Sequence, residues 1–138
     1  MASLIYDKAR ESFLKGDILI ASDNIKVALV KIGAGHYVVN SATDQFLNII
    51  AGADIIGTTA NLGTKTTTAG VFNAGNTTFA AVAAGPAAGA LVIYDDTGVS
   101  STSRLIAYID SYAGLPVTPN GSDINVSWPT DANKIFKL

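Results

Sequence analysis

The chain of 138 residues contains no cysteine, a single histidine and few charged residues. Without cysteine it can form neither a disulfide nor a thiolate zinc site, so its stability must come from packing and association. Charged residues make up 14% of the chain, well below the quarter or so that is typical of soluble domains. Because a low surface charge weakens repulsion between copies, we expect a homo-oligomer.

The chain also lacks basic runs and long apolar runs. Its nine Lys and Arg residues are scattered and its formal net charge is −2, so nothing could neutralise a stretch of phosphates and no nucleic-acid partner is expected. The longest weakly polar run, residues 79–94, contains glycine and proline and is shorter than the ~20 residues of a membrane-spanning helix. Charges at Asp7 and Lys8 interrupt the start, which therefore lacks the apolar region of a secretory signal. We expect no membrane partner and no export by that route.

Two short helices are predicted. Residues 6–16 carry apolar side chains at helical spacing, and Gly16 suits the left-handed position that follows a helix. This segment either covers the core through Phe13 and Leu14, or makes residues 1–16 an arm that reaches a neighbouring subunit. A second helix is predicted near residues 44–50, where several N-cap residues precede an apolar patch.

The rest of the chain has the alternation and turn residues of short strands. The clearest strands are residues 25–31, with Ile25, Val27 and Leu29 on one face, and residues 104–110. In residues 123–128, apolar side chains at even positions alternate with polar ones, which predicts one face on the core and one in water. Shorter strands are predicted at residues 36–40, 77–82, 87–94 and 135–138.

These strands define the expected fold. Residues 36–40 could return as a hairpin after the loop at 33–35, and Gly85-Pro86 marks a turn between residues 77–82 and 87–94. The pattern predicts one mainly β domain spanning residues 1–138, an antiparallel β-sandwich or jelly-roll-like barrel with one or two short helices. The small side chains of residues 80–82 and 87–92 would let the backbone of another subunit approach closely.

A search for chemistry predicts no catalytic, cofactor-binding or metal-binding residue. His36 is expected to be a partly exposed strand residue, because no cysteine or second histidine completes a metal site. No serine lies in a nucleophile elbow, and the glycines at 33–35 lack the helix that a dinucleotide loop requires. Asp95 and Asp96 are expected in a solvated turn, with a weak calcium site involving Asp110 or Asp123 as the alternative.

Several segments, taken in order along the chain, carry a resemblance to known proteins. They are residues 6–17, 23–30, 69–74, 105–110 (LIAYID), 116–124 (PVTPNGSDI) and 135–138 (IFKL). Together they resemble a group of small virion proteins of tailed bacteriophages, although residues 18–21 (ILIA) depart from the usual pattern after Gly-Asp. The resemblance implies a non-enzymatic decoration or cement subunit that binds the major capsid protein on the exterior of the phage head after synthesis in the host cytoplasm, with no catalytic residue to carry over.

Three hypotheses follow. The first is a cement protein that forms a homo-oligomer, with a trimer favoured, and stabilises the capsid through added interfaces. The second is a tail or fibre-associated module that binds a host receptor or glycan. The second requires large aromatic residues partly on the surface, whereas the first places most of them in the core or in subunit contacts: Tyr37, Tyr94, Tyr108, Tyr112 and Trp128. The third, an enzyme such as a glycosidase, requires paired carboxylates in a cleft, and nothing in the sequence calls for such a pair.

Overall fold

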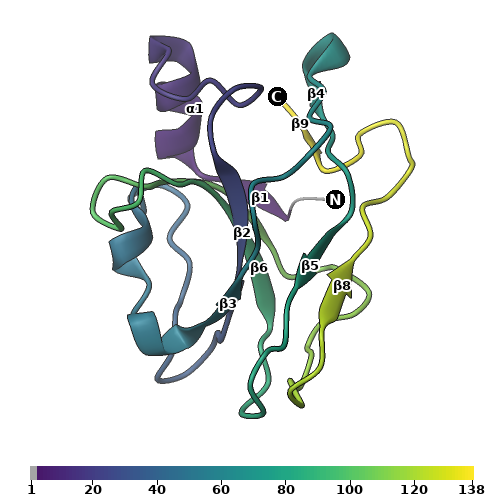
Figure 1. Cartoon of the computed structure of the whole chain (residues 1–138). Coiled ribbons are helices and arrows are strands. Elements are labelled where there is room, and N and C mark those ends of the chain that lie inside the picture. The colour runs from purple at the N-terminus through teal and green to yellow at the C-terminus, as the bar shows by residue number, and fades with distance from the viewer. Residues whose placement is uncertain (1–2) are drawn as a thin grey trace.

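A computed structural model describes residues 3–138. In this range the fold is mainly β, with antiparallel sheets that do not close into a barrel and one α-helix, as Figure 1 shows. The elements are β1 (Leu4–Ile5), α1 (Asp7–Lys15), β2 (Ile25–Val30), η1 (Leu47–Ile49), η2 (Gly52–Asp54), β3 (Ile55–Thr58), η3 (Thr68–Gly70), β4 (Val71–Phe72), β5 (Thr77–Phe79), β6 (Ala90–Asp95), β7 (Arg104–Ile109), β8 (Ile124–Val126) and β9 (Phe136–Lys137), where η denotes a 3-10 turn. No helix of the described range is long and apolar enough to cross a membrane. The prediction of a mainly β chain is confirmed.

A five-stranded antiparallel sheet in the order β1-β7-β6-β2-β3 forms the centre of the molecule. Its middle strands are buried on both faces: Val27 and Ala28, which point in opposite directions, are both fully buried. Figure 1 shows why, because η1 and η2 lie on one side of the sheet and β5 and β8 lie on the other. The strand predicted at residues 25–31 is present as β2, with Ile25, Val27 and Leu29 buried on one face and Ala28 and Val30 buried on the other.

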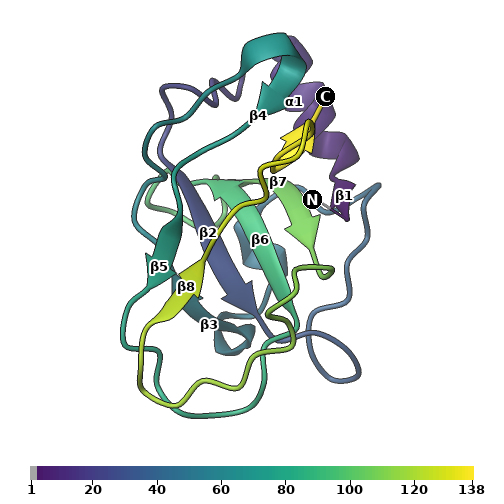
Figure 2. The same ribbon diagram turned by 90° about the vertical axis from the view of Figure 1, so that its right-hand side faces the viewer.

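Two short ribbons, β4–β9 and β5–β8, complete the strand pairing (Figure 2). The strands predicted at residues 77–82 and 87–94 exist in shortened or shifted form, but they belong to different sheets. β5 pairs with β8, while β6 pairs with β2 and β7. The segment that contains Gly85-Pro86 therefore connects two different sheets, because β6 pairs with the two long strands beside it and not with β5.

The strand predicted at residues 36–40 is absent. Tyr37 makes only an isolated parallel bridge to Ile32, and the surrounding segment is a loop. The buried Tyr37 hydroxyl donates to the Asp44 carboxylate at 2.6 Å and lies 2.9 Å from the Tyr6 hydroxyl. These tertiary hydrogen bonds hold the loop against the core in place of hairpin pairing. The helix predicted near residues 44–50 is reduced to the 3-10 turn η1, which has no side-chain cap.

The predicted N-terminal helix is present as α1. Gly16 follows it with φ of 79°, and the Gly16 N–H bonds to the carbonyls of Phe13 and Ser12. The helix lies against β7, with Ala9 and Ser12 buried, and the preceding β1 pairs with the same strand. Leu14 is 90% exposed, so the predicted contact of this residue with the core is wrong.

Candidate interaction surface

The loop between β5 and β6 exposes small apolar side chains. Its exposed alanines are Ala80, Ala81, Ala83, Ala84 and Ala87. Val82 is buried and anchors this alanine loop, residues 80–87, to the core. The Val82 N–H donates to the Ser122 carbonyl at 3.2 Å, and the Gly121 N–H donates to the Val82 carbonyl at 2.7 Å. The alanine loop is therefore fixed by backbone hydrogen bonds, and the methyl groups of its exposed alanines face outward.

Asp123 completes the anchoring of the alanine loop. Ala81 has a φ of 45°, a left-handed conformation that costs an L-residue about 1 kcal/mol. Its N–H donates to the Asp123 carboxylate at 2.7 Å, which offsets that cost. Residues 66–94 contain no charged residue and residues 111–130 contain only Asp123. The single charge in this region thus has a structural partner.

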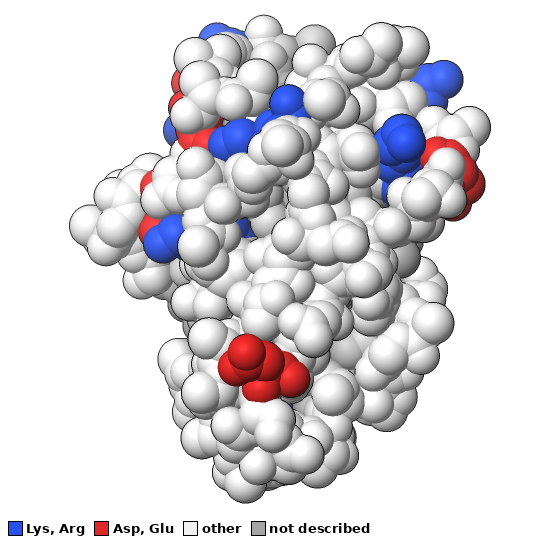
Figure 3. Space-filling model, turned by 45° about the vertical axis from the view of Figure 1, so that its right-hand side comes forward, with Lys and Arg blue, Asp and Glu red and all other residues white. Residues whose placement is uncertain are grey.

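The β5–β8 ribbon continues the uncharged surface above the loop. Thr78 and Asn125 point outward, and the Thr78 hydroxyl donates to the Asn125 side-chain carbonyl at 2.8 Å. Figure 3 shows that Lys and Arg gather toward the upper end of the molecule, while the lower part of this view is neutral apart from one acidic patch. We call residues 77–87 and 118–127 the neutral face.

One prediction about close contact with another subunit is wrong in part. Residues 80–82 include exposed alanines, as a contact surface requires, but Ala88 and Val92 are fully buried inside this chain. Val92 lies in β6, which pairs with β2 on one side and with β7 on the other, and its fully buried side chain cannot meet another subunit. The interface predicted at residues 87–92 is therefore wrong beyond Ala87.

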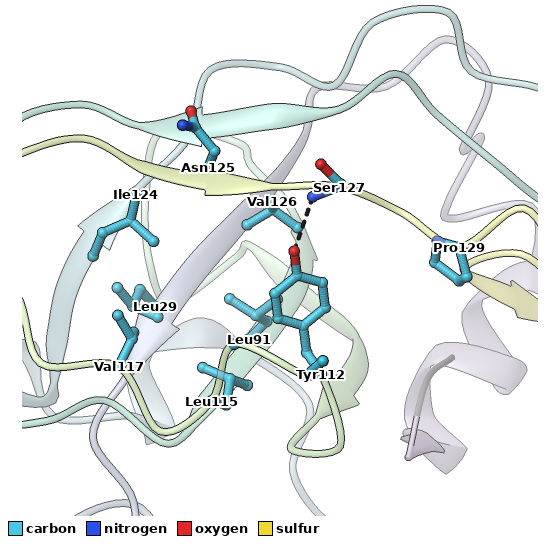
Figure 4. A pocket seen from close by; sticks show the side chains of 12 residues that line it. Leu29, Leu91, Tyr112, Leu115, Val117, Ile124, Asn125, Val126, Ser127 and Pro129 are labelled. Carbon is cyan, nitrogen blue, oxygen red and sulfur yellow. Dashed lines mark hydrogen bonds between the residues drawn. The ribbon is translucent and has the colours of Figure 1, made fainter.

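An apolar pocket of about 430 Å³ opens between the ribbon and the central sheet. Leu29 and Leu91 form its floor, and side chains from β8 and from the loop at residues 112–117 form its walls (Figure 4). Asn125 points away from the pocket, whereas Val126 points into it. The Tyr112 hydroxyl accepts a hydrogen bond from the Ser127 N–H at 3.0 Å. No Asp, Glu, His, Lys or Arg lines the pocket, so it offers apolar contact to a partner group and no acid or base.

His36 lies in a loop and not in the predicted strand. Its Nδ1 is 2.8 Å from the buried Asp54 carboxylate, and the imidazole is 39% exposed. Among residues 3–138 no group of three His, Asp or Glu side chains is placed to hold a metal ion. The observed partner gives His36 a structural role in fixing the loop against η2.

Asp95 is buried at the end of β6 and not in a solvated turn, which corrects its predicted environment. Burial, and next the charge and hydrogen bond of Asp23, raise the pKa of Asp95 to about 6, against the opposing effect of Arg104. Asp96 is in the turn and pairs with Lys26 at 2.6 Å. The hydrogen bond from Lys26 lowers the pKa of Asp96.

The acidic residues considered for calcium do not converge. Asp110 accepts a hydrogen bond from the Ser3 hydroxyl at 2.6 Å at the far end of β7, while Asp123 holds the alanine loop.

The large aromatic residues are mostly internal: Tyr37, Tyr94, Tyr108 and Trp128 are no more than 6% exposed, and Tyr112 is half-buried in the pocket wall.

The sequence prediction missed the pocket and the Asp23–Asp95 contact. The alternation in β8 indicated that Val126 faces inward, but nothing local indicates which loop would stand opposite it. Comparisons with protein-family models and with curated proteins find no match to this chain.

Proposed function

We propose that this chain is a non-enzymatic structural subunit of a tailed-phage virion, a decoration or cement protein that binds the major capsid protein on the outside of the head. The observation that carries the proposal is the neutral face, an ordered surface of alanine, threonine and asparagine with one internally engaged charge. Small side chains bring two backbones close together, and a surface whose one charged side chain is Asp123 limits the cost of desolvating ions. The order of segments that resembles small virion proteins supports the same assignment.

We also propose that the neutral face forms the contacts between copies of the chain, with a trimer as the favoured homo-oligomer. A stable specific interface commonly buries more than about 1,000 Å², which an alanine loop alone does not supply, so the ribbon and the pocket rim must take part. Each such contact adds modest stability, and the repetition of the contact over a shell multiplies the effect.

A β-sandwich is the finer fold that we propose. Its support is that Leu29 and Leu91 of the central sheet and Val126 of β8 line one pocket from opposite sides. The second layer would then be a sheet reduced to the β5–β8 ribbon. A jelly-roll is less well supported, because a fold of that kind needs two larger sheets of comparable size.

Receptor or glycan binding is the alternative function. It depends on aromatic rings at the surface, and four of the five large aromatic residues considered for it are buried. Tyr112 alone is half-buried, and its hydroxyl is engaged with Ser127. The buried rings favour the cement function.

The test begins with the mass of the purified protein by light scattering and the number of copies bound to empty heads assembled without it. Ala84→Trp places a bulky side chain on the neutral face, and Ala42→Trp makes the same change at another exposed site. We expect a defined oligomer that binds in many copies, with Ala84→Trp reducing the oligomer and Ala42→Trp leaving it intact. A monomer that ignores heads and adheres to host cells would replace the cement function with receptor binding.

A further inference from the structure

A second surface, at the opposite end of the molecule from the alanine loop, has a different chemistry. The outer side of α1 faces the β4–β9 ribbon there, as Figures 1 and 2 show. Two adjoining hollows of about 260 and 170 Å³ share Phe13 and Leu138 in their walls. We call their apolar residues the apolar groove: Phe13, Leu14, Ile20, Phe72, Phe136 and Leu138.

The apolar groove exposes large apolar side chains. Leu14 is 90% exposed and Leu138 is 56% exposed, while Phe13 and Ile20 are half-buried. Phe72 and Phe136 form the floor, with ring centroids 5.2 Å apart. Contiguous exposed apolar area beside a preformed hollow is typical of a protein-binding surface.

A polar hollow of about 280 Å³ adjoins this groove and carries positive charge. It shares Arg10 and Lys137 with the larger apolar hollow, and Ser3 and Asn133 add hydrogen-bonding groups. No Asp or Glu lines any of the three hollows. Arg10 also pairs with Asp7 at 3.1 Å, whereas Lys137 makes no ion pair within residues 3–138. The hollow therefore favours a carboxylate from outside this chain.

We propose that the apolar groove and the polar hollow together receive a segment of a capsid subunit that presents apolar side chains next to an Asp or Glu. This inference rests on the proposed cement function and identifies the surface that meets the shell. Two copies docked groove to groove would bring Arg10 and Lys137 of one toward those of the other, since a two-fold contact uses the same patch twice. Like charges at such an interface oppose that arrangement.

The test uses empty heads assembled from the major capsid protein of the phage that encodes the chain, with bound protein measured by co-sedimentation. Leu14→Ser removes the most exposed apolar side chain of the groove, and Lys137→Glu reverses the unpaired charge. Each should weaken binding by about tenfold or more, as expected when a central contact is lost. The matched controls are Val38→Ser, at another exposed apolar residue, and Lys31→Glu, at another lysine, and both should stay within about twofold of the unaltered chain.

The outcomes separate the two proposals. If the unaltered chain binds heads and the groove variants bind as well as their controls, the groove inference is overturned while the cement function stands. If the unaltered chain does not bind heads, the cement function fails and the inference falls with it. If the groove variants keep full head binding but lose the solution oligomer, the groove contains a second copy, and the proposed occupant is wrong.

Discussion

Single residues in this chain depend on contacts that sequence neighbours do not reveal. Asp95 follows Tyr94 and precedes a turn, a context typical of a solvated carboxylate. In the fold it stands opposite Ile25 on one side and Arg104 on the other, and Asp23 approaches it from the loop before β2. Burial and Asp23 together raise its pKa to about 6. A proton is therefore retained in the folded state at a pH where the unfolded chain has lost it.

The first prediction concerns the pH dependence that follows. A carboxyl whose pKa is higher in the folded state makes stability fall as pH rises, here between about 4 and 6. The loss by pH 7 is no more than about 3 kcal/mol, because each pKa unit corresponds to ~1.4 kcal/mol and solvent screening reduces the effect. Asp95→Asn should remove this loss, so urea unfolding at pH 4, 5, 6 and 7 should show a smaller fall in its unfolding free energy than in the unaltered chain.

The control for this experiment is Asp110→Asn, which makes the same chemical change at an exposed carboxylate. Asp96 acts in the opposite direction, since Lys26 lowers its pKa and the stability it contributes is lost as pH falls. Its contribution is common to the unaltered chain and Asp110→Asn, whereas Asp95→Asn also removes the repulsion between Asp95 and Asp96. Equal pH profiles for Asp95→Asn and the unaltered chain would contradict the prediction.

At the scale of elements, the local sequence was sufficient to predict a strand made of consecutive apolar residues. It was insufficient where side chains form long-range hydrogen bonds. Residues 104–109 are apolar enough to form a central strand whatever surrounds them, and they do. Tyr37 looked like a strand residue, but its hydroxyl belongs to a network with Tyr6 and Asp44 that no local pattern encodes. The apolar groove was missed because Leu14 and Leu138 are distant in sequence, and they were expected to be a core residue and a strand residue.

The second prediction concerns this buried network, which ties the start of α1 to the loop at residues 33–44. Burial is the main cause that raises the pKa of both Tyr6 and Tyr37, so both hydroxyls stay protonated and available as donors. Tyr37→Phe leaves the Tyr6 hydroxyl buried without this partner and should cost about 1 to 3 kcal/mol of unfolding free energy. Urea denaturation measures the change directly.

Tyr94→Phe is the matched control, because Tyr94 is also buried and its hydroxyl forms no hydrogen bond within residues 3–138. Its cost should be below about 1 kcal/mol. The network would be unimportant to stability if both variants changed the unfolding free energy equally. Hydrogen exchange should locate the effect of Tyr37→Phe at the Asn40 amide, which donates to the same Asp44 oxygen at 2.8 Å.

The whole molecule has two ends with different chemistry. The neutral face is formed by β5, β8 and the alanine loop, and its one charged side chain, the exposed Asp123, accepts a hydrogen bond from the Ala81 N–H. The apolar groove lies at the other end, where α1 and β9 contribute Lys8, Arg10, Lys15 and Lys137. Of these, Lys8 pairs with Glu11 and Arg10 pairs with Asp7 on α1. A subunit that uses the first surface for its own copies and the second for a shell can join several capsid subunits at once, which is what the proposed cement function requires.

The last prediction uses the salt concentration to test whether the neutral face joins the copies and the apolar groove binds the shell. Contacts between uncharged surfaces depend little on ionic strength, whereas attraction between Lys137 and a partner carboxylate is screened as the Debye length falls from about 14 Å at ~0.05 M to about 4 Å at ~0.5 M. Over that range the oligomer mass by light scattering should stay constant, while head binding should weaken several-fold. Lys137→Glu should bind heads weakly at low salt and should not weaken further as salt rises, because salt screens the repulsion between the introduced carboxylate and the partner carboxylate. An oligomer that dissociates with salt while head binding holds would exchange the two assignments, because the charged end would then join the copies and the neutral face would meet the shell.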